Sequence, residues 1–208
     1  MIFIVTGENR HLFESELAQM HRQRKAVFID DLGWKVPAIG GMEIDSYDHA
    51  NTIYLLLHDE AGQELLASAR LFPTTQPHLM TDVFAHLCAL PPPTGPLVWE
   101  ASRFCASPEL AGRRRLEVLW QILAGVMETC LLFGIEQIVF TANRAFLPLA
   151  MQCGWDARTL GNTVADGDDH VTPVCVQIHP AGLRSLRRRF GIEGPVTRFV
   201  TPRLRVAA

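Results

Sequence analysis

Charged side chains of both signs stand among aromatic ones in the first half of the chain. Arg24 precedes Phe28 and Trp34, and an acidic run that includes Asp45 and Asp48 follows. A charge flanked by large apolar groups tends to be partly buried, and a buried charge is unfavourable unless it has a partner or a ligand. Carboxylates suit a cationic or amino-bearing substrate, whereas arginines suit a carboxylate or a phosphate. The pattern indicates a polar pocket for a charged small molecule.

A second group of charges lies in two strand-like runs. Arg70 falls in the run 64–72, and Glu100 and Arg103 fall in the run 97–105. Side chains alternate between the two faces of a regular strand, so Glu100 and Arg103 would point in opposite directions. They face one cavity only if a β-bulge interrupts the alternation, and bulges gather near active sites.

The composition is that of a compact globular chain. Of its 208 residues, 48% are hydrophobic and 20% are charged, which is enough apolar material for one sizeable core. We expect a single domain over 1–208, because the only candidate boundary is the short proline-rich connector at 91–96. The formal net charge of -3 argues against nucleic-acid binding, which normally needs a basic excess.

The first residues and the cysteines bear on location and metal binding. The apolar run 2–5 has no basic leader and is too short for a signal peptide core or a membrane span. We therefore expect a first strand, no membrane span and a cytoplasmic protein. The five cysteines include no C-x-x-C pair and the eight histidines show no metal-binding spacing, so we expect reduced, mostly buried thiols and no metal. The cysteines are Cys88, Cys105, Cys130, Cys153 and Cys175.

Hydrophobic periodicity predicts the elements that position these groups. Helical spacing follows Asn9, a plausible N-cap, and Arg24 falls on the apolar stripe of that helix. A guanidinium there needs an acidic partner or an anionic ligand, unless its stem packs while its head reaches water. Residues 29–51 form a long loop, which we expect to cover a substrate. The alternative for Asp48 alone is a turn or capping residue.

The remaining elements define the fold class. The order of strands and helices predicts an α/β fold of the α+β type, with a mixed β-sheet flanked by helices and a parallel crossover around the longest helix. We expect strands at 52–58, 64–72, 97–105, 135–142, 171–178 and from 196 onward, and helices at 80–87, 115–133, 145–153 and 183–190.

The longest helix follows Gly112 and three arginines. Backbone N–H groups and arginines at a helix N-terminus make a good anion site, suited to the phosphates of a pantetheine-bearing donor. The alternative is that Arg113, Arg114 and Arg115 form a solvated surface. The chain has no G-x-G-x-x-G, no G-x-x-x-x-G-K-[ST] and no G-x-S-x-G motif, so dinucleotide, nucleoside triphosphate and serine hydrolase chemistry lack support.

The motifs together resemble those of one family, the acyl-homoserine-lactone synthases, or autoinducer synthases, of quorum-sensing bacteria. The resemblance covers about the first 105 residues, at near-family spacing, and continues more loosely through the strand–helix–strand that follows. The matching set is Arg24 and Phe28, Trp34, Glu43-x-Asp45-x-x-Asp48, Arg70-Leu71, Asp82-x-Phe84 and Trp99-Glu100-x-Ser102-Arg103.

The resemblance implies a fold, a reaction and its substrates. The fold is GNAT-like, with a splayed sheet whose V-shaped cleft receives an acyl-pantetheine thioester. The substrates are S-adenosylmethionine and an acyl thioester on coenzyme A or acyl carrier protein, the second of which is then a partner, and no cofactor is needed. The amine attacks the thioester, and the carboxylate then closes on the γ-carbon and expels methylthioadenosine. The product is an N-acyl-L-homoserine lactone.

The residue types fit the binding of S-adenosylmethionine. Asp45 and Asp48 suit its positive groups, whereas Arg24 and Arg103 suit its carboxylate or the acidic side chains. Phe28 and Trp34 suit the adenine and the sulfonium, because aromatic faces attract cations by up to about 2 kcal/mol when desolvated. Arg70 either binds the substrate or ties the carboxylates together.

Glu100 is the expected general base, with Arg103 and Asp48 as the other catalytic residues. An amine nucleophile must lose a proton, which Glu100 would accept directly or through a water. We expect the apolar Trp99 beside this carboxylate to raise its pKa toward the working range. The alternative is that Glu100 only pairs with Arg103 or Arg24.

The acyl and pantetheine groups are expected to meet residues around the splay. The backbone near Phe104 and Cys105 suits polarisation of the thioester carbonyl, Thr141 is a candidate contact for the acyl chain, and Arg113, Arg114 and Arg115 suit the phosphates or an acidic carrier protein. Two departures stand out: Ala67 replaces a common glycine, and the usual acetyltransferase pyrophosphate signature is missing, which leaves the donor open.

Two rival functions are compatible with the same fold. One is a GNAT-type N-acyltransferase that uses acyl-coenzyme A on another amine, which predicts no binding of S-adenosylmethionine. The other is a non-catalytic relative that binds ligand without turnover.

Overall fold

The chain folds around one large mixed sheet. The computed structural model describes residues 1–166 and 169–201, and within them the sheet has nine strands in the order β11-β1-β4-β5-β6-β7-β10-β8, with β9 paired to β10. The strands are β1 Ile2–Val5, β4 Ile53–His58, β5 Leu65–Pro73, β6 Val98–Ala106, β7 Gln137–Asn143, β8 Asp156–Thr159, β9 Val164–Asp166, β10 Asp169–Gln177 and β11 Thr197–Phe199, and β2 Ala38–Ile39 with β3 Met42–Glu43 forms a separate hairpin.

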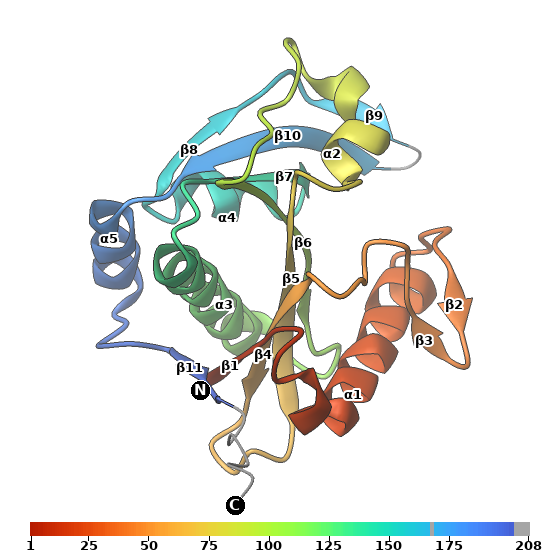
Figure 1. Ribbon diagram of the computed structural model, residues 1–208, viewed down its shortest axis with the longest axis vertical. Helices are drawn as coiled ribbons and strands as arrows, with labels where there is room; N and C mark the ends of the chain where they lie inside the picture. The colour runs from red at the N-terminus through yellow and green to blue at the C-terminus, as the bar shows by residue number, and fades with distance from the viewer. Residues whose placement is uncertain (167–168, 202–208) are drawn as a thin grey trace, which may run out of the picture.

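Helices cover both faces of the sheet, which confirms the predicted fold class. In Figure 1, α3 and α5 lie on one side of β4, β5 and β6, whereas α1 and the β2–β3 hairpin lie on the other. The α-helices are α1 Glu14–Arg24, α2 Leu79–Asp82, α3 Gly112–Phe133, α4 Leu147–Gln152 and α5 Pro180–Phe190. Short helical segments occupy Arg10–Leu12 and Ala85–Leu87, and a π-helical segment occupies Lys25–Asp31.

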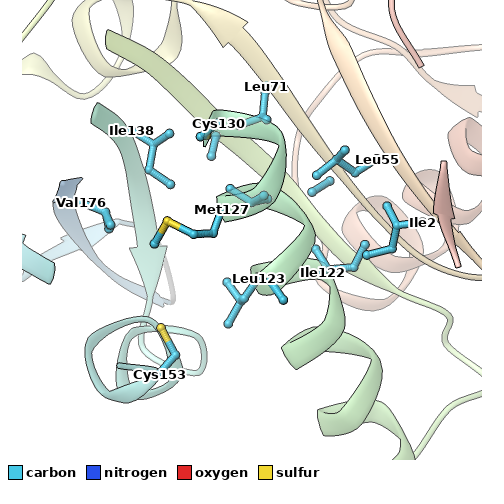
Figure 2. Packing of buried hydrophobic residues seen from close by; sticks show 14 of the residues in the cluster. Ile2, Leu55, Leu71, Ile122, Leu123, Met127, Cys130, Ile138, Cys153 and Val176 are labelled. Atoms are coloured by element: carbon cyan, nitrogen blue, oxygen red, sulfur yellow. The ribbon is translucent and has the colours of Figure 1, made fainter. Parts of the chain in front are cut away.

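The main core lies between α3 and the sheet. The apolar stripe of α3 includes Leu123, Met127 and Cys130, which are fully buried and pack with Ile138 of β7 and Val176 of β10 (Figure 2). By length and composition α3 is also long enough to cross a membrane, but 56% of its most apolar stretch is buried within the protein. The stripe is therefore the core face of an interior helix.

Strands β6 and β7 pair only at their beginnings. They run parallel on either side of the α3 crossover, as predicted, and their ladder consists of Val98–Gln137, Trp99–Ile138 and Glu100–Val139. The rest of each strand pairs instead with its outer neighbour, β5 or β10. The sheet is thus split into a V, and Glu100 lies at the vertex where the shared ladder ends.

A β-bulge interrupts β6 beyond that vertex. Ser68 and Arg70 of β5 pair with Cys105 and Ser102 of β6, so β6 has one residue more than its partner over this stretch. The bulge includes Arg103, the one non-glycine residue with a positive φ (53°) in the described part of the chain. A left-handed backbone at an arginine is costly and tends to occur at functional sites. Glu100 and Arg103 were predicted to share a face only if a bulge lay between them, and the structure confirms that bulge.

Several element boundaries differ from the sequence prediction. Asn9 is not the cap of α1, which begins after Phe13; the buried Asn9 side chain instead accepts from Thr6 N and donates to the Ile4 and Val200 carbonyls. The region 29–51 is not wholly irregular, because it includes part of the π-helical segment and the β2–β3 hairpin. The predicted helix 80–87 is two short pieces, and α3 begins one turn earlier than expected. The five cysteines are free thiols, all buried except the half-buried Cys88.

Candidate active site

Three arginines and three carboxylates form a closed ring of ion pairs on the α1 side of the sheet. Arg24 binds Glu43 and Asp48, Arg70 binds Asp48 and Asp45, and Arg103 binds Asp45 and Glu43. Each charge therefore has two partners of opposite sign and the six charges sum to zero. The side chains are between 0% and 8% exposed. Such burial is tolerable only because every member is paired and hydrogen-bonded.

Four segments distant in sequence supply the ring. Arg24 is the last residue of α1, Glu43 ends β3, Arg70 lies in β5 and Arg103 is at the bulge of β6. The remaining two acids are held by a turn after β3, in which the Asp45 N–H donates to Asp48 Oδ2 at 2.9 Å and the Asp48 N–H donates to the Asp45 carbonyl at 3.1 Å. The turn fixes both carboxylates, as expected of aspartates in turns.

Asp48 has the most partners in the ring. Its carboxylate accepts from Arg24 at 2.8 and 2.9 Å and from the Tyr54 hydroxyl at 2.9 Å, besides the Asp45 N–H. Burial alone would raise the pKa of Asp48, but the Arg24 hydrogen bonds and the Arg70 charge hold that pKa well below its usual range. Burial likewise opposes the charge of Arg24, yet the hydrogen bonds that Arg24 donates to Asp48 raise the pKa of Arg24. Both groups remain charged at neutral pH.

Aromatic side chains lie against two of the three arginines of the ring, Arg103 and Arg70. Phe28 and Trp34 stack on each other with centroids 4.7 Å apart, and the Arg103 guanidinium lies 5.4 and 5.6 Å from the two ring centroids. The Arg70 guanidinium lies 5.2 Å from the Phe72 ring. These distances are those of cation–π contacts. The charged and aromatic residues singled out in the sequence thus lie together, with Arg103 and Arg70 against aromatic faces, whereas the pocket for a small molecule stays a prediction.

Glu100 lies near the ring but outside it. Its carboxylate is 1% exposed and accepts from the Met80 N–H at 3.0 Å, so α2 covers it. Burial raises the pKa of Glu100 to about 8, although the Met80 hydrogen bond and the Arg70 charge act in the opposite direction. Glu100 forms no ion pair with Arg103 or Arg24 within 4.0 Å in the described part of the chain. The alternative in which Glu100 only pairs with one of these arginines is therefore wrong.

The segment after β3 contacts helix α2 near this carboxylate. The Tyr47 hydroxyl donates to Asp82 Oδ2 at 3.3 Å, and the Tyr47 ring stacks on Phe72. Burial and the neighbouring Asp82 raise the pKa of Tyr47 to about 12, so this hydroxyl is protonated at neutral pH. Tyr47 of the 29–51 segment thus contacts α2 near Glu100, whereas the substrate-covering role of the segment stays a prediction.

The predicted acyl and pantetheine residues fall in three places. Phe104 lies on the α3 side of β6, whereas the Cys105 side chain is buried against Val27 and Phe28 on the other side, where burial raises the pKa of its thiol to about 12. The Thr141 hydroxyl on β7 is buried and has no hydrogen-bond partner in the described residues.

The three arginines Arg113, Arg114 and Arg115 occupy the first turn of α3. Arg113 and Arg114 are exposed and pair with Glu117, at 2.8 and 3.9 Å. That first turn has no acidic residue and no side-chain cap, so its free N–H groups donate to no capping side chain and are open to a ligand. The arrangement suits an anion, but it does not distinguish phosphates from an acidic protein.

Sequence reasoning assigned no role to three residues of the site. Glu43 completes the ring, Tyr54 donates to Asp48, and Ser102 accepts from Arg70 Nε at 3.0 Å. Glu43 was detectable, because it opens the acidic run Glu43-x-Asp45-x-x-Asp48 and three buried arginines need three carboxylates. Tyr54 and Ser102 gave no comparable signal, since tyrosine and serine are ordinary residues in strands.

The fold and the site define a class of protein before any family is considered. A mixed sheet split between two parallel strands is the architecture of the GNAT-like fold. A candidate N-acetyltransferase from Lactobacillus plantarum shares the fold with a TM-score of 0.58 at 14% identity, over 86% of this chain and 99% of that one.

The family is shown at higher similarity. The autoinducer synthase family profile matches residues 8–184. Isovaleryl-homoserine lactone synthase of Bradyrhizobium diazoefficiens is 33% identical over 198 residues, covering 94% of this chain and 88% of that protein. The solved structure of BjaI, a CoA-dependent acyl-homoserine lactone synthase with SAM and isopentyl-CoA, superposes with a TM-score of 0.88 at 33% identity, covering 98% of this chain and 95% of that one.

The chain belongs to the autoinducer synthase family. It is an acyltransferase that makes N-acyl-L-homoserine lactone, a quorum-sensing signal, from S-adenosylmethionine and an acyl thioester, with release of methylthioadenosine. The rival reading, an N-acyltransferase acting on another amine, is not supported.

Proposed function

We propose that Glu100 is the general base of the acyl transfer. It removes a proton from the amine of S-adenosylmethionine, directly or through a water, as the amine nitrogen attacks the thioester carbonyl and the thiol of the carrier departs. The observation that carries this role is its place at the vertex of the β6–β7 splay, with a pKa raised to about 8 by burial. A base with a pKa near the working pH is the most effective.

We further propose that the ion-pair ring holds the sulfonium amino acid beside Glu100. Arg103, at 7% exposure of its side chain, is the ring arginine most open to a ligand, which suits the substrate carboxylate. Asp45, at 8%, is the most open acid and suits the ammonium. Arg24 and Asp48 are buried deeper and orient these two, and Arg70 ties Asp45 to Asp48. Phe28 and Trp34 support Arg103 and suit the adenine and sulfonium.

The second bond is then made within the acylated intermediate. The carboxylate oxygen attacks the γ-carbon, the carbon–sulfur bond breaks and methylthioadenosine leaves with the electron pair. No proton needs to be removed in this step, so the protein's contribution is orientation. Arg103 and Phe104 have no register partner on β5, and N–H groups freed at such a bulge suit the thioester oxygen in the first step.

Coenzyme A is the acyl donor that we propose. The relative crystallised with isopentyl-CoA supports this, as does the uncapped first turn of α3 with its arginines, which suits the phosphates of the nucleotide. Acyl carrier protein is the second candidate, because Arg187, Arg188 and Arg189 on α5 add a further basic surface. We also propose that residues 1–208 act as one domain, in the cytoplasm where both substrates are made.

The proposal is tested by offering the purified protein S-adenosylmethionine with matched acyl-CoA and acyl carrier protein thioesters and measuring the lactones by mass spectrometry. We expect lactone and methylthioadenosine in equal amounts from the CoA thioester. The double variant Arg113→Glu/Arg114→Glu should raise KM for acyl-CoA several-fold, whereas the matched Arg188→Glu/Arg189→Glu should not. Binding of S-adenosylmethionine without turnover would favour a non-catalytic relative, and activity confined to the carrier protein would overturn the choice of donor.

A further inference from the structure

The Asp82-x-Phe84 motif lies in the short segment that covers Glu100. Asp82 is the last residue of α2, and Phe84 follows it. Phe84 and the fully buried Met80 pack in one apolar cluster with Val139 of β7, and this packing anchors α2 to the sheet. The Met80 N–H donates to Glu100 Oε2 at 3.0 Å. The same short helix therefore fixes where Asp82 lies relative to Glu100.

Tyr47 links Asp82 to the site. Its hydroxyl donates to Asp82 Oδ2 at 3.3 Å, and its ring stacks on Phe72 with centroids 5.7 Å apart. Phe72 is the residue of β5 in register with Glu100. Burial, and after it the charges of Asp82 and Glu100, raise the pKa of Tyr47, so the three polar groups lie close together. The hydroxyl thus holds the exposed Asp82 carboxylate beside the site.

Two charged side chains act on Glu100 in opposite directions. Burial is the largest cause of the raised pKa of Glu100; Arg70 of β5 lowers that pKa, whereas Asp82 of α2 raises it. The register neighbours of Glu100 on the two flanking strands, Phe72 and Val139, are apolar. A carboxylate that faces a cation alone is a weaker base, because the cation stabilises its charged form. Asp82 offsets this effect of Arg70.

We propose that Asp82, held by the Tyr47 hydroxyl, is a positioning residue that acts through Glu100: its negative charge keeps Glu100 basic enough to accept the amine proton. The inference rests on the proposed role of Glu100 as the general base. The proton moves from the amine nitrogen to a Glu100 oxygen, and Asp82 acts on that carboxylate only through its charge. Because Asp82 is exposed, it carries the charge at little cost, whereas a second buried carboxylate would be unfavourable.

The experiment measures how kcat/KM for S-adenosylmethionine depends on pH in wild type, Asp82→Asn and Asp82→Glu, with an acyl-CoA that the wild-type enzyme turns over. The substrate ammonium titrates in all three, so a difference between the profiles reports the protein. Asp82→Asn removes the charge and should move the midpoint of the rising limb down by about one pH unit and lower the plateau several-fold. Asp82→Glu keeps the charge and should retain the wild-type midpoint. An unshifted midpoint in a folded Asp82→Asn enzyme would overturn the inference.

Tyr47→Phe tests whether the hydroxyl acts through Asp82. The variant keeps the ring that stacks on Phe72 but releases the carboxylate, so the midpoint should fall, though by less than in Asp82→Asn. The double variant Tyr47→Phe/Asp82→Asn should shift no further than Asp82→Asn alone, because both changes act on one interaction. Additive shifts would overturn the link between the two residues.

Asp156 of β8 provides a matched control for the change in net charge. Its side chain is 65% exposed, and β7 and β10 separate β8 from β6. Asp156→Asn removes one negative charge, as Asp82→Asn does, and should leave the pH profile unchanged. An equal shift in both variants would mean that net charge rather than Asp82 sets the midpoint, and the inference would fail.

The outcomes separate this inference from the proposed function. A folded Glu100→Gln enzyme as fast as wild type would overturn the role of Glu100 as the base, and the role of Asp82 with it. A slow Glu100→Gln enzyme together with an unshifted Asp82→Asn profile would overturn the role of Asp82 alone.

Discussion

Replacing Asp48 with asparagine tests whether the ion-pair ring is a charge-balanced unit. Asp48→Asn preserves the size of the side chain but leaves three arginines facing two carboxylates, at a position whose side chain is 2% exposed. Removing one partner of a buried ion pair costs about 3–5 kcal/mol, because the remaining charge stays buried without compensation. We expect a loss of that size in the free energy of unfolding.

The assay is urea unfolding at neutral pH, followed by tryptophan fluorescence. The same substitution at Asp30 is the control, because Asp30 pairs with Lys25 at 2.7 Å but the two side chains are 52% and 32% exposed. Exposed pairs contribute about 0.2–1 kcal/mol, so Asp30→Asn should change stability little. A loss at Asp48 no larger than the loss at Asp30 would refute the closed ring. The double variant Arg24→Met/Asp48→Leu, which removes opposite charges together, should recover part of the loss.

The sign of the pH dependence follows from the depressed pKa of Asp48. The stabilisation is complete above the unfolded pKa of about 3.9 and is lost as pH falls through the lower folded value. The difference between wild type and Asp48→Asn should therefore be constant from neutral pH down to about pH 5 and shrink below about pH 4. A difference that was constant to the lowest pH at which the protein folds would contradict this linkage.

Two further substitutions test features away from the site. Glu128 of α3 accepts from Arg187 at 2.6 Å and from the Val196 and Thr197 N–H groups at 3.0 Å. Glu128→Gln should therefore lower the free energy of unfolding by about 2–3 kcal/mol and speed amide hydrogen exchange at the start of β11. Unchanged exchange there would contradict this role of Glu128. Burial lowers the pKa of His58, so the contribution of the neutral His58 to stability is complete above about pH 6.5 and is lost as pH drops below it. Between about pH 7.5 and 5.5, the urea midpoint of His58→Phe should therefore fall less than that of wild type. Equal falls would count against this role of His58.

The sequence predicted the layers of the fold because apolar periodicity records burial directly. The α3 stripe and the strands β4, β5 and β7 are long, strongly apolar and bounded by breakers, so their type and order followed. Strands β8 and β9 were missed, because they are short, polar edge strands with little burial to leave a pattern. Asn9 was misread because its side chain bonds to distant backbone groups rather than to the next helix.

Five of the six charged residues of the ring were predicted to belong to the site, but their pairing was not. Residue types around Arg24, Arg70 and Arg103 indicated a polar cluster, and the need for Glu100 and Arg103 to share a face predicted the bulge in β6. Which acid meets which arginine depends on long-range register and on the turn at 45–48, neither of which is local. The contacts of Phe104 with Phe140 and Phe146 have the same origin, since these rings meet only after α3 brings β7 beside β6.

The account rests on Glu100 as the base at the vertex of the splay, and Glu100→Gln tests this most directly. The rate of amide formation from S-adenosylmethionine and isovaleryl-CoA would be measured for both enzymes across the pH range. Because the substrate ammonium titrates in both, the comparison isolates the carboxylate. We predict that wild-type kcat/KM rises up to about pH 8, the pKa of Glu100. At and above that pH, Glu100→Gln should be about 10²–10⁴-fold slower with its fold intact, and the difference should shrink as pH falls below it. A folded Glu100→Gln enzyme within a few-fold of wild type at every pH would contradict the account.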